Sequence, residues 1–506
     1  MIHATDTICA PATSAGMGAI AVIRVSGPDA LAAVDRVVAF RSGTAAAAKG
    51  YTVKFGNAAG LDDVLVSIFR APRSYTGEDA AEISCHASPY IVSALLDKLT
   101  EAGCRLAEPG EFTRRAYVNG KMDLAQAEAV ADVIAASSAA QHRVAMNQLR
   151  GGYSAELRGL RKQLLELTSL LELELDFSEE DVEFADRSRL RALLDTACSH
   201  CRQLADSFRL GNAIKNGVPV AIVGAPNSGK STLLNALLRD DRAIVSDIPG
   251  TTRDTVEETS VIDGVLFRFI DTAGIREASD EVERLGIERT FRKIGEAEIV
   301  LGVVDASMPQ EAVSAAISEI EGRVDPARQK LLILLNKEDK TKPASGTVTI
   351  SGPGGRREYD DYVRPKPATG TTTISTPGGR CEDDDKTRPK PASGTTTLSG
   401  PGGRCAALRI SAKHGAGLEE LRATLAASAG VASATGTLVT NARHAAALRE
   451  AAASLSAVSD GLDRGIPSDL LAEDLRAALT SLGSITGLIT TDEVLGEIFS
   501  KFCIGK

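Results

Sequence analysis

Hydrophobic positions in the first 120 residues form short runs separated by turns. Residues 19–25 have the pattern of a buried strand that ends at a Ser-Gly-Pro turn, and residues 64–69 have the pattern of a second strand. Residues 94–99 are typical of part of a helix. The pattern therefore predicts an α+β module for residues 1–120.

The hydrophobic period changes at about residue 124, where Gly and Pro become rare and Leu, Ala, Glu and Arg dominate as far as residue 210. Successive leucines are spaced three or four residues apart, as on one face of a helix, at Leu157, Leu160, Leu164, Leu167, Leu171 and Leu175. Residues 441–506 have the same texture. We therefore expect helices from both stretches to pack together, with the residues between them forming an insertion.

The inserted stretch begins at Gly217 with an apolar run, residues 218–223, that leads into a glycine-rich turn. Three further strand patterns follow at 266–270, 299–305 and 331–335, with helical patterns between them. Alternation of strands and helices predicts a mostly parallel sheet wrapped by helices.

A repeat with a period of 24 residues interrupts this pattern. Its copies begin with Lys-Pro-Ala-Ser/Thr-Gly-Thr at Lys342, Lys366 and Lys390, and each runs into Pro-Gly-Gly-Arg. Large apolar residues are nearly absent, so the segment cannot bury enough surface to offset the entropy cost of ordering. The composition favours a flexible surface insertion over residues 341–405, and three stacked β-turn units with a binding role are the alternative.

Composition narrows the class of protein. The 506 residues are 43% hydrophobic and 25% charged, which is ordinary for globular proteins, and the length predicts two or three domains. A net charge of −10 excludes a surface that is positively charged overall, but it is compatible with a local basic site for nucleic acid. The chain contains no run of 18 apolar residues, so the sequence predicts no membrane span. Eight scattered cysteines and the lack of a leader pattern favour a bacterial cytoplasmic protein, and Cys198 and Cys201 are expected to be ordinary helix residues.

The segment Gly224-Ala-Pro-Asn-Ser-Gly-Lys-Ser231 matches the phosphate-binding loop G-x-x-x-x-G-K-[ST]. It follows a predicted strand and precedes a helical pattern at 232–238, which is the context that phosphate binding requires. Lys230 is expected to reach the β- and γ-phosphates, and the Ser231 hydroxyl is expected to bind magnesium.

Two short segments indicate that the base is guanine. Asn336-Lys-Glu-Asp339 follows the apolar run 331–335, and a carboxylate there can accept from N1–H and the exocyclic amine of guanine, a pair of donors that adenine lacks. Ser411-Ala-Lys413 follows another apolar run, 407–410, and is expected to support the base from the other side. In this order behind a phosphate loop, they favour GTP over ATP.

The remaining nucleotide motifs lie between these segments. Asp271-Thr-Ala-Gly274 follows a predicted strand, so Asp271 is expected near magnesium and the Gly274 amide near the γ-phosphate. Thr251 and Thr252 belong to a loop expected to order around magnesium when the γ-phosphate is present. Ras-like proteins carry a water-orienting glutamine after the glycine, but this chain has an isoleucine there. The candidates for the missing polar group are Arg253, Arg276, Glu277, Glu281 and Glu283.

At this point the chain resembles the MnmE (TrmE) family of tRNA-modification GTPases. Beyond the shared nucleotide motifs, the resemblance rests on Ser-Tyr-Thr-Gly-Glu-Asp at 74–79, Pro-Gly-Glu-Phe-Thr at 109–113, Lys-Met-Asp-Leu-Ala-Gln-Ala-Glu at 121–128, the stretch 271–289, and the terminal Phe-Cys-Ile-Gly-Lys at 502–506. It spans nearly the whole chain except roughly 340–405, where the repeat departs from the family pattern.

The resemblance implies an architecture of multidomain α/β plus α class. It comprises an N-terminal α+β domain for folate binding and dimerisation at 1–120, a helical domain at 121–215 and 431–506, and an inserted P-loop GTPase domain with a mostly parallel sheet at 216–430. The repeat insertion at 341–405 would lie within the GTPase domain. The N-terminal domains would form a constitutive homodimer, and the GTPase domains would associate in the transition state.

The resemblance also assigns residues. Magnesium would be held by Ser231 and Thr252, and a catalytic role would fall to Glu283, which would orient the attacking water. Potassium, in place of an arginine finger, would be held by Asn227, Ser246, Ile248 and Thr251. GTP would be bound by Asn227, Ser228, Gly229, Lys230, Ser231, Thr232, Asp271, Thr272, Ala273, Gly274, Asn336, Lys337, Asp339, Ser411, Ala412 and Lys413. A tetrahydrofolate such as 5-formyltetrahydrofolate would be bound by Arg24, Glu82, Lys121 and Lys506. Cys503 is a further candidate for catalysis, with a structural thiol as the alternative.

The function that the resemblance implies is GTP hydrolysis coupled to tRNA modification. With an MnmG-type flavoprotein in a heterotetramer, the protein would add an aminomethyl or carboxymethylaminomethyl group to carbon 5 of the wobble uridine. Three alternatives remain: a ribosome-assembly or RNA-chaperone GTPase, a folate-dependent one-carbon transferase that its GTPase domain regulates, and a scaffold.

Overall fold

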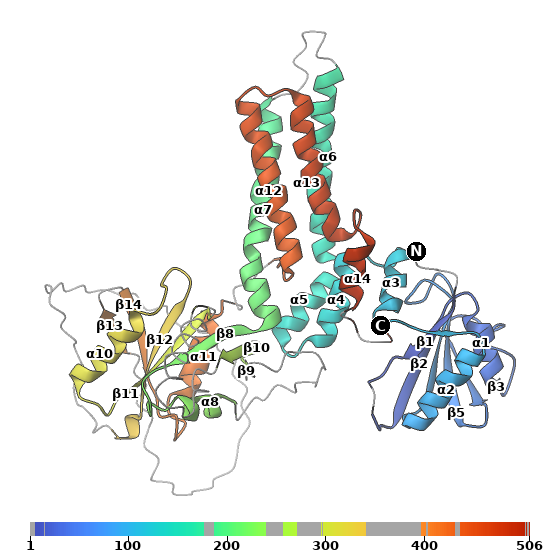
Figure 1. Cartoon of the computed structure of the whole chain (residues 1–506), viewed down its shortest axis with the longest axis horizontal. Helices are drawn as coiled ribbons and strands as arrows, with labels where there is room; N and C mark the ends of the chain where they lie inside the picture. Colours follow the sequence, from blue (N-terminus) through green and yellow to red (C-terminus); the bar gives the residue numbers. More distant parts are fainter. Residues whose placement is uncertain are drawn as a thin grey trace, which may run out of the picture. The chain divides into compact units, whose positions relative to one another are not determined.

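The computed structural model describes residues 6–14, 16–176, 187–238, 257–270, 295, 297–340, 396–400, 403–430, 436–500, 502 and 505. The chain divides into two compact units, one made of Met1–Lys215 with Ala434–Lys506 and the other of Asn216–Ser433. Figure 1 colours both along the sequence. Within the described ranges no helix is long and apolar enough to cross a membrane.

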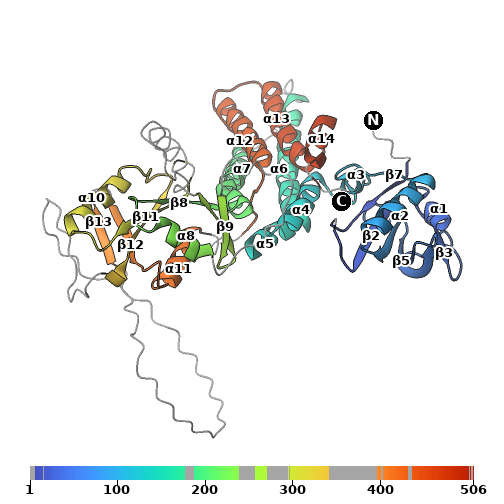
Figure 2. The same cartoon turned by 60° about the horizontal axis from the view of Figure 1, so that its bottom comes forward.

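The first unit contains a seven-stranded sheet with the strand order β3-β4-β5-β6-β2-β1-β7. The strands are β1 (Ile8–Pro11), β2 (Ile20–Ser26), β3 (Val38–Phe40), β4 (Thr52–Ala58), β5 (Asp62–Phe69), β6 (Ala80–His86) and β7 (Arg105–Leu106). Helices α1 (Ala30–Val37) and α2 (Pro89–Glu101) contact β2 and β6 and cover one face, which Figure 2 shows from a second direction. Alternate residues such as Ile23, Val66 and Ile83 fill the core beneath these helices.

The opposite face of this sheet carries several exposed apolar side chains, although Arg24 on this face lies 5.6 Å from the ring of Phe112. Strand register aligns Val22, Ser84, Leu65 and Phe55 in one row across β2, β6, β5 and β4. The adjacent row contains Arg24, Glu82, Ser67 and Val53. We refer to these two rows as the open sheet face. Its large apolar side chains include Val53 (62% exposed) and Leu65 (50% exposed).

Short helices connect the sheet to a helical bundle: α3 (Glu111–Val118), α4 (Leu124–Ala135), α5 (Ala139–Leu149) and α14 (Asp492–Ser500). Asp123 and Ser138 each begin a helix with a reciprocal capping box, which satisfies backbone N–H groups that would otherwise lack partners. Apolar residues of α4 pack against Phe499 and Phe502 near the end of the chain. Gly505, a described residue of the C-terminal end, lies against Pro11 of β1 and Arg24 of β2.

The bundle itself is formed by α6 (Gly152–Asp176), α7 (Arg187–Asn216), α12 (Ala442–Asp463) and α13 (Ser468–Thr486), which lie side by side in Figures 1 and 2. Leu157, Leu160, Leu164 and Leu167 of the predicted leucine stripe are almost fully buried in its core. Each such burial stabilises the fold by about 2 kcal/mol. Helices from both sequence stretches share this core, as the hydrophobic pattern predicted.

The second unit is built on another seven-stranded sheet, with the order β13-β14-β12-β11-β8-β10-β9. Its strands are β8 (Val218–Val223), β9 (Glu257–Ile262), β10 (Val265–Ile270), β11 (Ile299–Asp305), β12 (Lys330–Asn336), β13 (Thr396–Gly400) and β14 (Gly403–Arg409). The five central strands are parallel and both edge strands are antiparallel. The described helices are α8 (Lys230–Leu238), α10 (Gln310–Glu321), α11 (Leu418–Ser428) and the short η1 (Glu338–Lys340). The mostly parallel sheet predicted from the alternating pattern is confirmed.

The sequence pattern missed both edge strands of this sheet. β13 lies within the third copy of the repeat, for which the composition predicted no regular structure, and it pairs antiparallel with β14. Its Thr-rich sequence has the β propensity for this role, and the backbone of β14 supplies the partner. Backbone pairing with β14 places these five residues at the edge of the sheet. The remainder of the repeat insertion, 341–395 with 401–402, lies outside the described residues, except for 403–405 at the start of β14.

Candidate functional site

The phosphate loop joins β8 to α8 and contains two glycines that no other residue could replace without displacement of neighbours. Gly224 has φ +153°, and a Cβ there would stand 2.2 Å from the carbonyl oxygen of Val303 on β11. Gly229 has φ +102°, and a Cβ there would stand 2.2 Å from Nδ2 of Asn336. The loop can therefore keep its backbone N–H groups turned toward an anion only because these positions lack side chains.

Lys230 begins α8 and folds back over the loop. Its Nζ donates to the carbonyl oxygens of Gly224 and Ala225, at 2.9 Å each. A cation at a helix N-terminus over a glycine loop is the arrangement that holds the phosphates of nucleotides. Ser231 and Thr232 follow on the first turn of the helix and are exposed, as are Ala225, Pro226 and Asn227 at the tip of the loop, whereas Ser228 is buried.

Asn336 links the phosphate loop to the turn predicted to support the base. It ends β12 and is only 3% exposed. Its Nδ2 donates to the Ser228 carbonyl oxygen at 2.8 Å, while its Oδ1 accepts from the Ala412 backbone N–H at 3.0 Å. One buried amide thus fixes three segments that are far apart in sequence, as a buried polar group with both hydrogen bonds satisfied can do.

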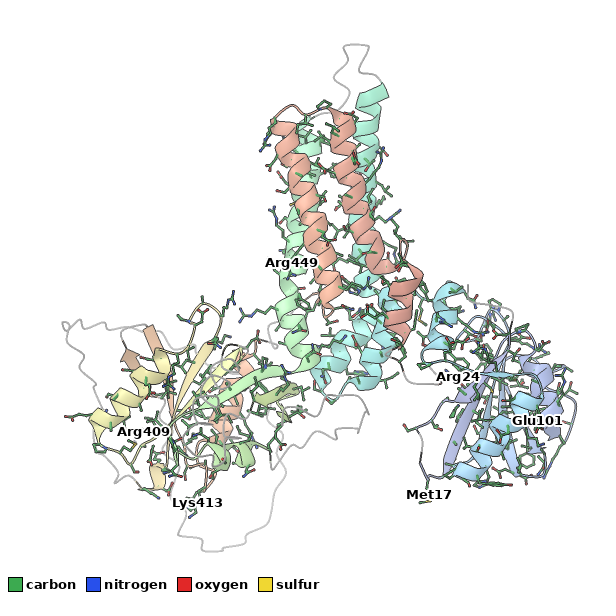
Figure 3. All side chains as sticks on the ribbon, viewed as in Figure 1. Met17, Arg24, Glu101, Arg409, Lys413 and Arg449 are labelled. Carbon is green, nitrogen blue, oxygen red and sulfur yellow. The ribbon has the colours of Figure 1, made fainter. Side chains whose placement is uncertain are left out.

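Asp339 and Ser411 face each other beside this amide. Ser411 Oγ donates to Oδ1 of Asp339 at 2.7 Å, and this hydrogen bond holds the pKa of the carboxyl below its ordinary value. The carboxylate is therefore ionised and oriented at neutral pH. Lys413, labelled in Figure 3, lies two residues further along the same turn.

Lys337 has a partner that the sequence did not indicate. Its Nζ donates to Oδ2 of Asp305 at 2.6 Å, and its backbone adopts φ +66°. Burial alone would raise the pKa of Asp305, but hydrogen bonds from Lys337 and Ser307 outweigh it and lower the pKa. Asp305 is the last residue of β11, and Asn336 is the last residue of the adjacent parallel strand β12. A carboxylate at the end of the neighbouring predicted strand was the signal in the sequence that could have identified Asp305 as the partner of Lys337.

A cavity of about 460 Å³ adjoins the loop. Loop residues, including Asn227 and Lys230, line one side of it, and residues of β11 and α10 line the other. The structure thus places a hollow beside the cation of Lys230 and the glycine-rich backbone.

Several predicted site residues lie outside the described residues. They are Ser246, Ile248, Thr251, Thr252, Arg253, Asp271, Thr272, Ala273, Gly274, Arg276, Glu277, Glu281, Glu283, Cys503 and Lys506. Among the predicted ligands of magnesium and potassium, the described ones are Ser231 and Asn227.

A second candidate site lies on the sheet of the first unit. Arg24 forms two hydrogen bonds with Oε1 of Glu82, through Nε at 3.0 Å and Nη2 at 2.8 Å, and Figure 3 labels its position. Both side chains line a cavity of about 190 Å³ together with Phe69, Tyr75, Thr76 and Ala80. Nη1 of Arg24 also donates to the Gly505 carbonyl oxygen at 3.3 Å.

Tyr75 is a further residue of this cavity that sequence reasoning missed. The Arg24 guanidinium lies 5.3 Å from the centroid of its ring, and burial raises the pKa of its hydroxyl. Tyr75 belongs to the quoted 74–79 segment, which was the available signal. Lys121 is not brought into this group, because its Nζ donates to the Pro72 carbonyl oxygen at 2.8 Å and it does not line the cavity.

Comparison with known proteins extends over both units. Residues 7–121 match the family described as the GTP-binding protein TrmE N-terminus, and residues 124–503 match the MnmE helical domain. The G domain of the T. maritima FeoB iron transporter superposes with 20% identity and a TM-score of 0.24, covering 42% of this chain and 98% of that one.

Two relatives match along almost their whole length. The tRNA modification GTPase MnmE of Bacteroides fragilis is 46% identical over 509 residues, which cover 99% of both chains. The tRNA modification GTPase MnmE of Porphyromonas gingivalis is 47% identical over 510 residues, 99% of this chain and 98% of that protein. Since both the motifs and the full-length similarity agree, the chain belongs to the MnmE family of tRNA modification GTPases.

Proposed function

We propose that this chain hydrolyses GTP and uses the cycle to drive modification of tRNA in the bacterial cytoplasm. With an MnmG-type flavoprotein it adds an aminomethyl or carboxymethylaminomethyl group to carbon 5 of the wobble uridine. The observation that carries the nucleotide part is Asn336, whose amide joins Ser228 of the phosphate loop to Ala412 of the base-recognition turn. The tRNA part is supported by the names of the full-length relatives.

In this proposal the described residues bind and orient the nucleotide. The loop N–H groups and Lys230 hold the phosphates, and Asp339 reads the two donors of guanine. Ser231 presents an exposed hydroxyl on the first turn of α8, which fits a magnesium ligand, with Thr252 as its proposed partner. Magnesium would supply neutralisation of charge on the β- and γ-phosphate oxygens.

Potassium and dimerisation of the GTPase unit complete the hydrolytic proposal. Asn227 is exposed at the tip of the loop with φ +61°, and an exposed side-chain amide there suits a monovalent cation beside the phosphates. Ser246, Ile248 and Thr251 are the other proposed ligands, and Glu283 is proposed to orient the attacking water. Potassium would supply charge stabilisation of the kind that an arginine finger gives elsewhere.

The cavity beside Arg24 is the proposed site of a tetrahydrofolate. Its lining combines a cation, a carboxylate and the buried ring of Tyr75, which fits a flat ring that carries N–H donors and an anionic tail. Its volume suits the bicyclic ring alone, so the remainder of the molecule would extend out of it. Lys121 and Lys506 are proposed for that part, and Cys503 is the proposed additional reactive group.

The open sheet face is the proposed surface for constitutive homodimerisation. It exposes Val53, Phe55 and Leu65 on the same side of the sheet as Arg24 and Glu82. Contiguous exposed apolar side chains mark interaction surfaces in soluble proteins. A partner copy seated there would also border the proposed folate cavity.

The first experiment compares steady-state GTP hydrolysis by the full chain in potassium and sodium buffers, with ATP in parallel. We expect the GTP rate to rise by about tenfold or more in potassium, because a cation at the phosphates acts mainly on the transition state. ATP hydrolysis should stay at background. Equal GTP rates in both salts would overturn the potassium mechanism.

The tRNA part is tested in a bacterial strain that lacks its own homologue and therefore lacks the modified wobble uridine. Expression of this chain should restore that modification.

A further inference from the structure

An ion pair lies within the segment that is proposed to recognise the base. Nζ of Lys337 is 2.6 Å from Oδ2 of Asp305, and the two side chains are only 25% and 17% exposed. Lys337 stands between Asn336, whose amide bonds to the phosphate loop, and Asp339, which is proposed to read guanine. A contact that fixes Lys337 is therefore placed to act on guanine recognition.

Asp305 is itself held by contacts other than Lys337. Its Oδ1 accepts from the backbone N–H and from the hydroxyl of Ser307, at 2.9 and 2.6 Å. The strand register sets Asp305 opposite Asn336, and the Ala306 N–H donates to the Asn336 carbonyl oxygen at 2.8 Å. One carboxylate oxygen is thus bound to its own turn, and the other is presented to Lys337.

Lys337 needs such an anchor because of its backbone. Its φ of +66° lies in the left-handed region, which is unfavourable for a residue with a Cβ and persists only where surrounding contacts hold it. Directly after it, the Lys340 N–H donates to the Lys337 carbonyl oxygen at 2.9 Å and closes a short turn. Asp339 belongs to that turn, and its Oδ1 accepts from Ser411 Oγ at 2.7 Å. The orientation of the carboxylate proposed to read guanine thus depends on the conformation of Lys337.

We infer that Asp305 is a positioning residue for guanine-nucleotide binding: its ion pair with Lys337 holds the left-handed turn that presents Asp339 to the base. The inference rests on the proposed function, because it requires Asp339 to read guanine. Asp305 acts on the base end of the nucleotide, so its loss should weaken binding and leave hydrolysis at saturating GTP nearly unchanged. Because hydrogen bonds that involve charged groups are stronger than neutral ones, removal of the Asp305 charge should weaken binding about fivefold to twentyfold.

The experiment is a double-mutant cycle on the full chain, with the dissociation constant of a fluorescent GDP analogue as the measured quantity. Asp305→Asn keeps the shape of the side chain but removes its charge, and Lys337→Met keeps the aliphatic stem but removes the ammonium group. Asp305→Asn alone should weaken GDP binding about fivefold to twentyfold. The same change in the Lys337→Met background should weaken it less than about twofold, because the two residues act as one unit.

Steady-state GTP hydrolysis separates positioning from a general structural defect. Asp305→Asn should raise KM in proportion to the dissociation constant and leave kcat within about twofold of the wild-type value. Ser307→Ala is the second variant, because it removes the hydroxyl that holds Oδ1 of Asp305 and leaves both charges of the ion pair in place. It should weaken GDP binding about twofold to fivefold.

The matched control is Asp325→Asn, which makes the same change at an exposed turn of the same unit. Oδ1 of Asp325 accepts from the Ala327 N–H at 3.0 Å, as Oδ1 of Asp305 does from the N–H two residues further on. Its oppositely charged neighbour, Arg328, is 4.0 Å away and 86% exposed. This variant should retain the wild-type dissociation constant and KM.

Two results would overturn the inference and leave the proposed function intact. One is wild-type GDP affinity in both Asp305→Asn and Ser307→Ala. The other is an equal loss from Asp305→Asn with and without Lys337→Met, since Asp305 would then not act through Lys337. Absence of GDP binding by the wild type, with the chain folded by circular dichroism, would instead overturn the proposed function.

Discussion

The amide of Asn336 fills the space that a side chain at position 229 would need. An ideal Cβ on Gly229 would stand 2.2 Å from Nδ2 of Asn336, the same nitrogen that donates to the Ser228 carbonyl oxygen. The glycine of the phosphate loop and the asparagine of the base-recognition segment therefore define one packing arrangement, and a change at either should disturb both.

Gly229→Ala tests this relationship. The new methyl group must displace Asn336 from its bonds to Ser228 and Ala412, and φ +102° strains any residue with a side chain. Strain of 1–3 kcal/mol predicts a loss of GTP affinity of about tenfold or more by isothermal titration calorimetry.

The control for that variant is Gly159→Ala on α6, where an added Cβ meets nothing within 4 Å. It should leave GTP affinity unchanged and stabilise the bundle by up to about 1 kcal/mol through helix propensity. Equal GTP affinity of Gly229→Ala and wild type would show that the loop and Asn336 do not act as one unit.

Asp339→Asn is expected to change the preferred base from guanine to xanthine. An amide can accept one hydrogen bond and donate another, so it loses one guanine contact but can donate to the carbonyl that xanthine carries in place of the amine. GTP affinity should fall by about tenfold to a hundredfold, and XTP should bind more tightly than GTP. Competition of the two nucleotides against a fluorescent analogue measures the ratio. A uniform loss of affinity for both nucleotides would mean that Asp339 supports the fold and does not read the base.

The contacts of Glu128 predict that the helical bundle loses stability at acid pH. It is buried on α4 and interacts with Nδ2 of Asn441 at 3.2 Å, Nη2 of Arg443 at 2.9 Å and Nε2 of His444 at 2.8 Å. Burial alone would raise the pKa of this carboxyl, but His444 and Arg443 outweigh it and lower the pKa to about 2. A lowered pKa means that the stabilisation is complete above the unfolded-state value and disappears as the pH falls toward 2.

The expected loss between about pH 4.5 and 2 is about 3 kcal/mol of unfolding free energy, measured by urea denaturation at stepped pH. Glu128→Gln should be less stable at neutral pH and should lose less on acidification. Glu101→Gln on α2, whose side chain is 66% exposed, is the control and should follow the wild type. If the unfolding free energy of Glu128→Gln fell with pH as steeply as that of the wild type, other carboxylates would be responsible for the acid sensitivity.

The open sheet face predicts which substitutions dissociate the proposed homodimer. Phe55 and Leu65 are direct neighbours across β4 and β5, so Phe55→Lys with Leu65→Lys places two charges at its centre. Light scattering should then show a monomer. Tyr90→Lys is the control: Tyr90 is 72% exposed but belongs to α2, on the covered side of the sheet, so this variant should remain dimeric. A dimeric Phe55→Lys/Leu65→Lys variant would exclude this face.

Local patterns predicted much of the fold. The leucine stripe of α6, the apolar runs that became β8, β11 and β12, and the loop sequence 224–231 each depend on contacts with near neighbours, so they can be identified one segment at a time. The edge strands β9 and β13 escaped prediction because an edge strand depends on the hydrogen bonds of its partner more than on its own apolar residues.

By itself, the sequence determined the chemistry that is available: a glycine loop with Lys230, an Asn-Lys-x-Asp segment, and an Arg and a Glu in the N-terminal module. Tertiary structure alone decided which of these groups meet. Asn336 bonds to Ser228, 108 residues away, because β12 and the loop after β8 end at the same edge of a parallel sheet. Arg24 meets Gly505, 481 residues away, because Gly505 lies against Pro11 of β1, the strand that pairs with β2. Contacts at such separations follow from strand order and helix packing, which no local pattern of residues encodes.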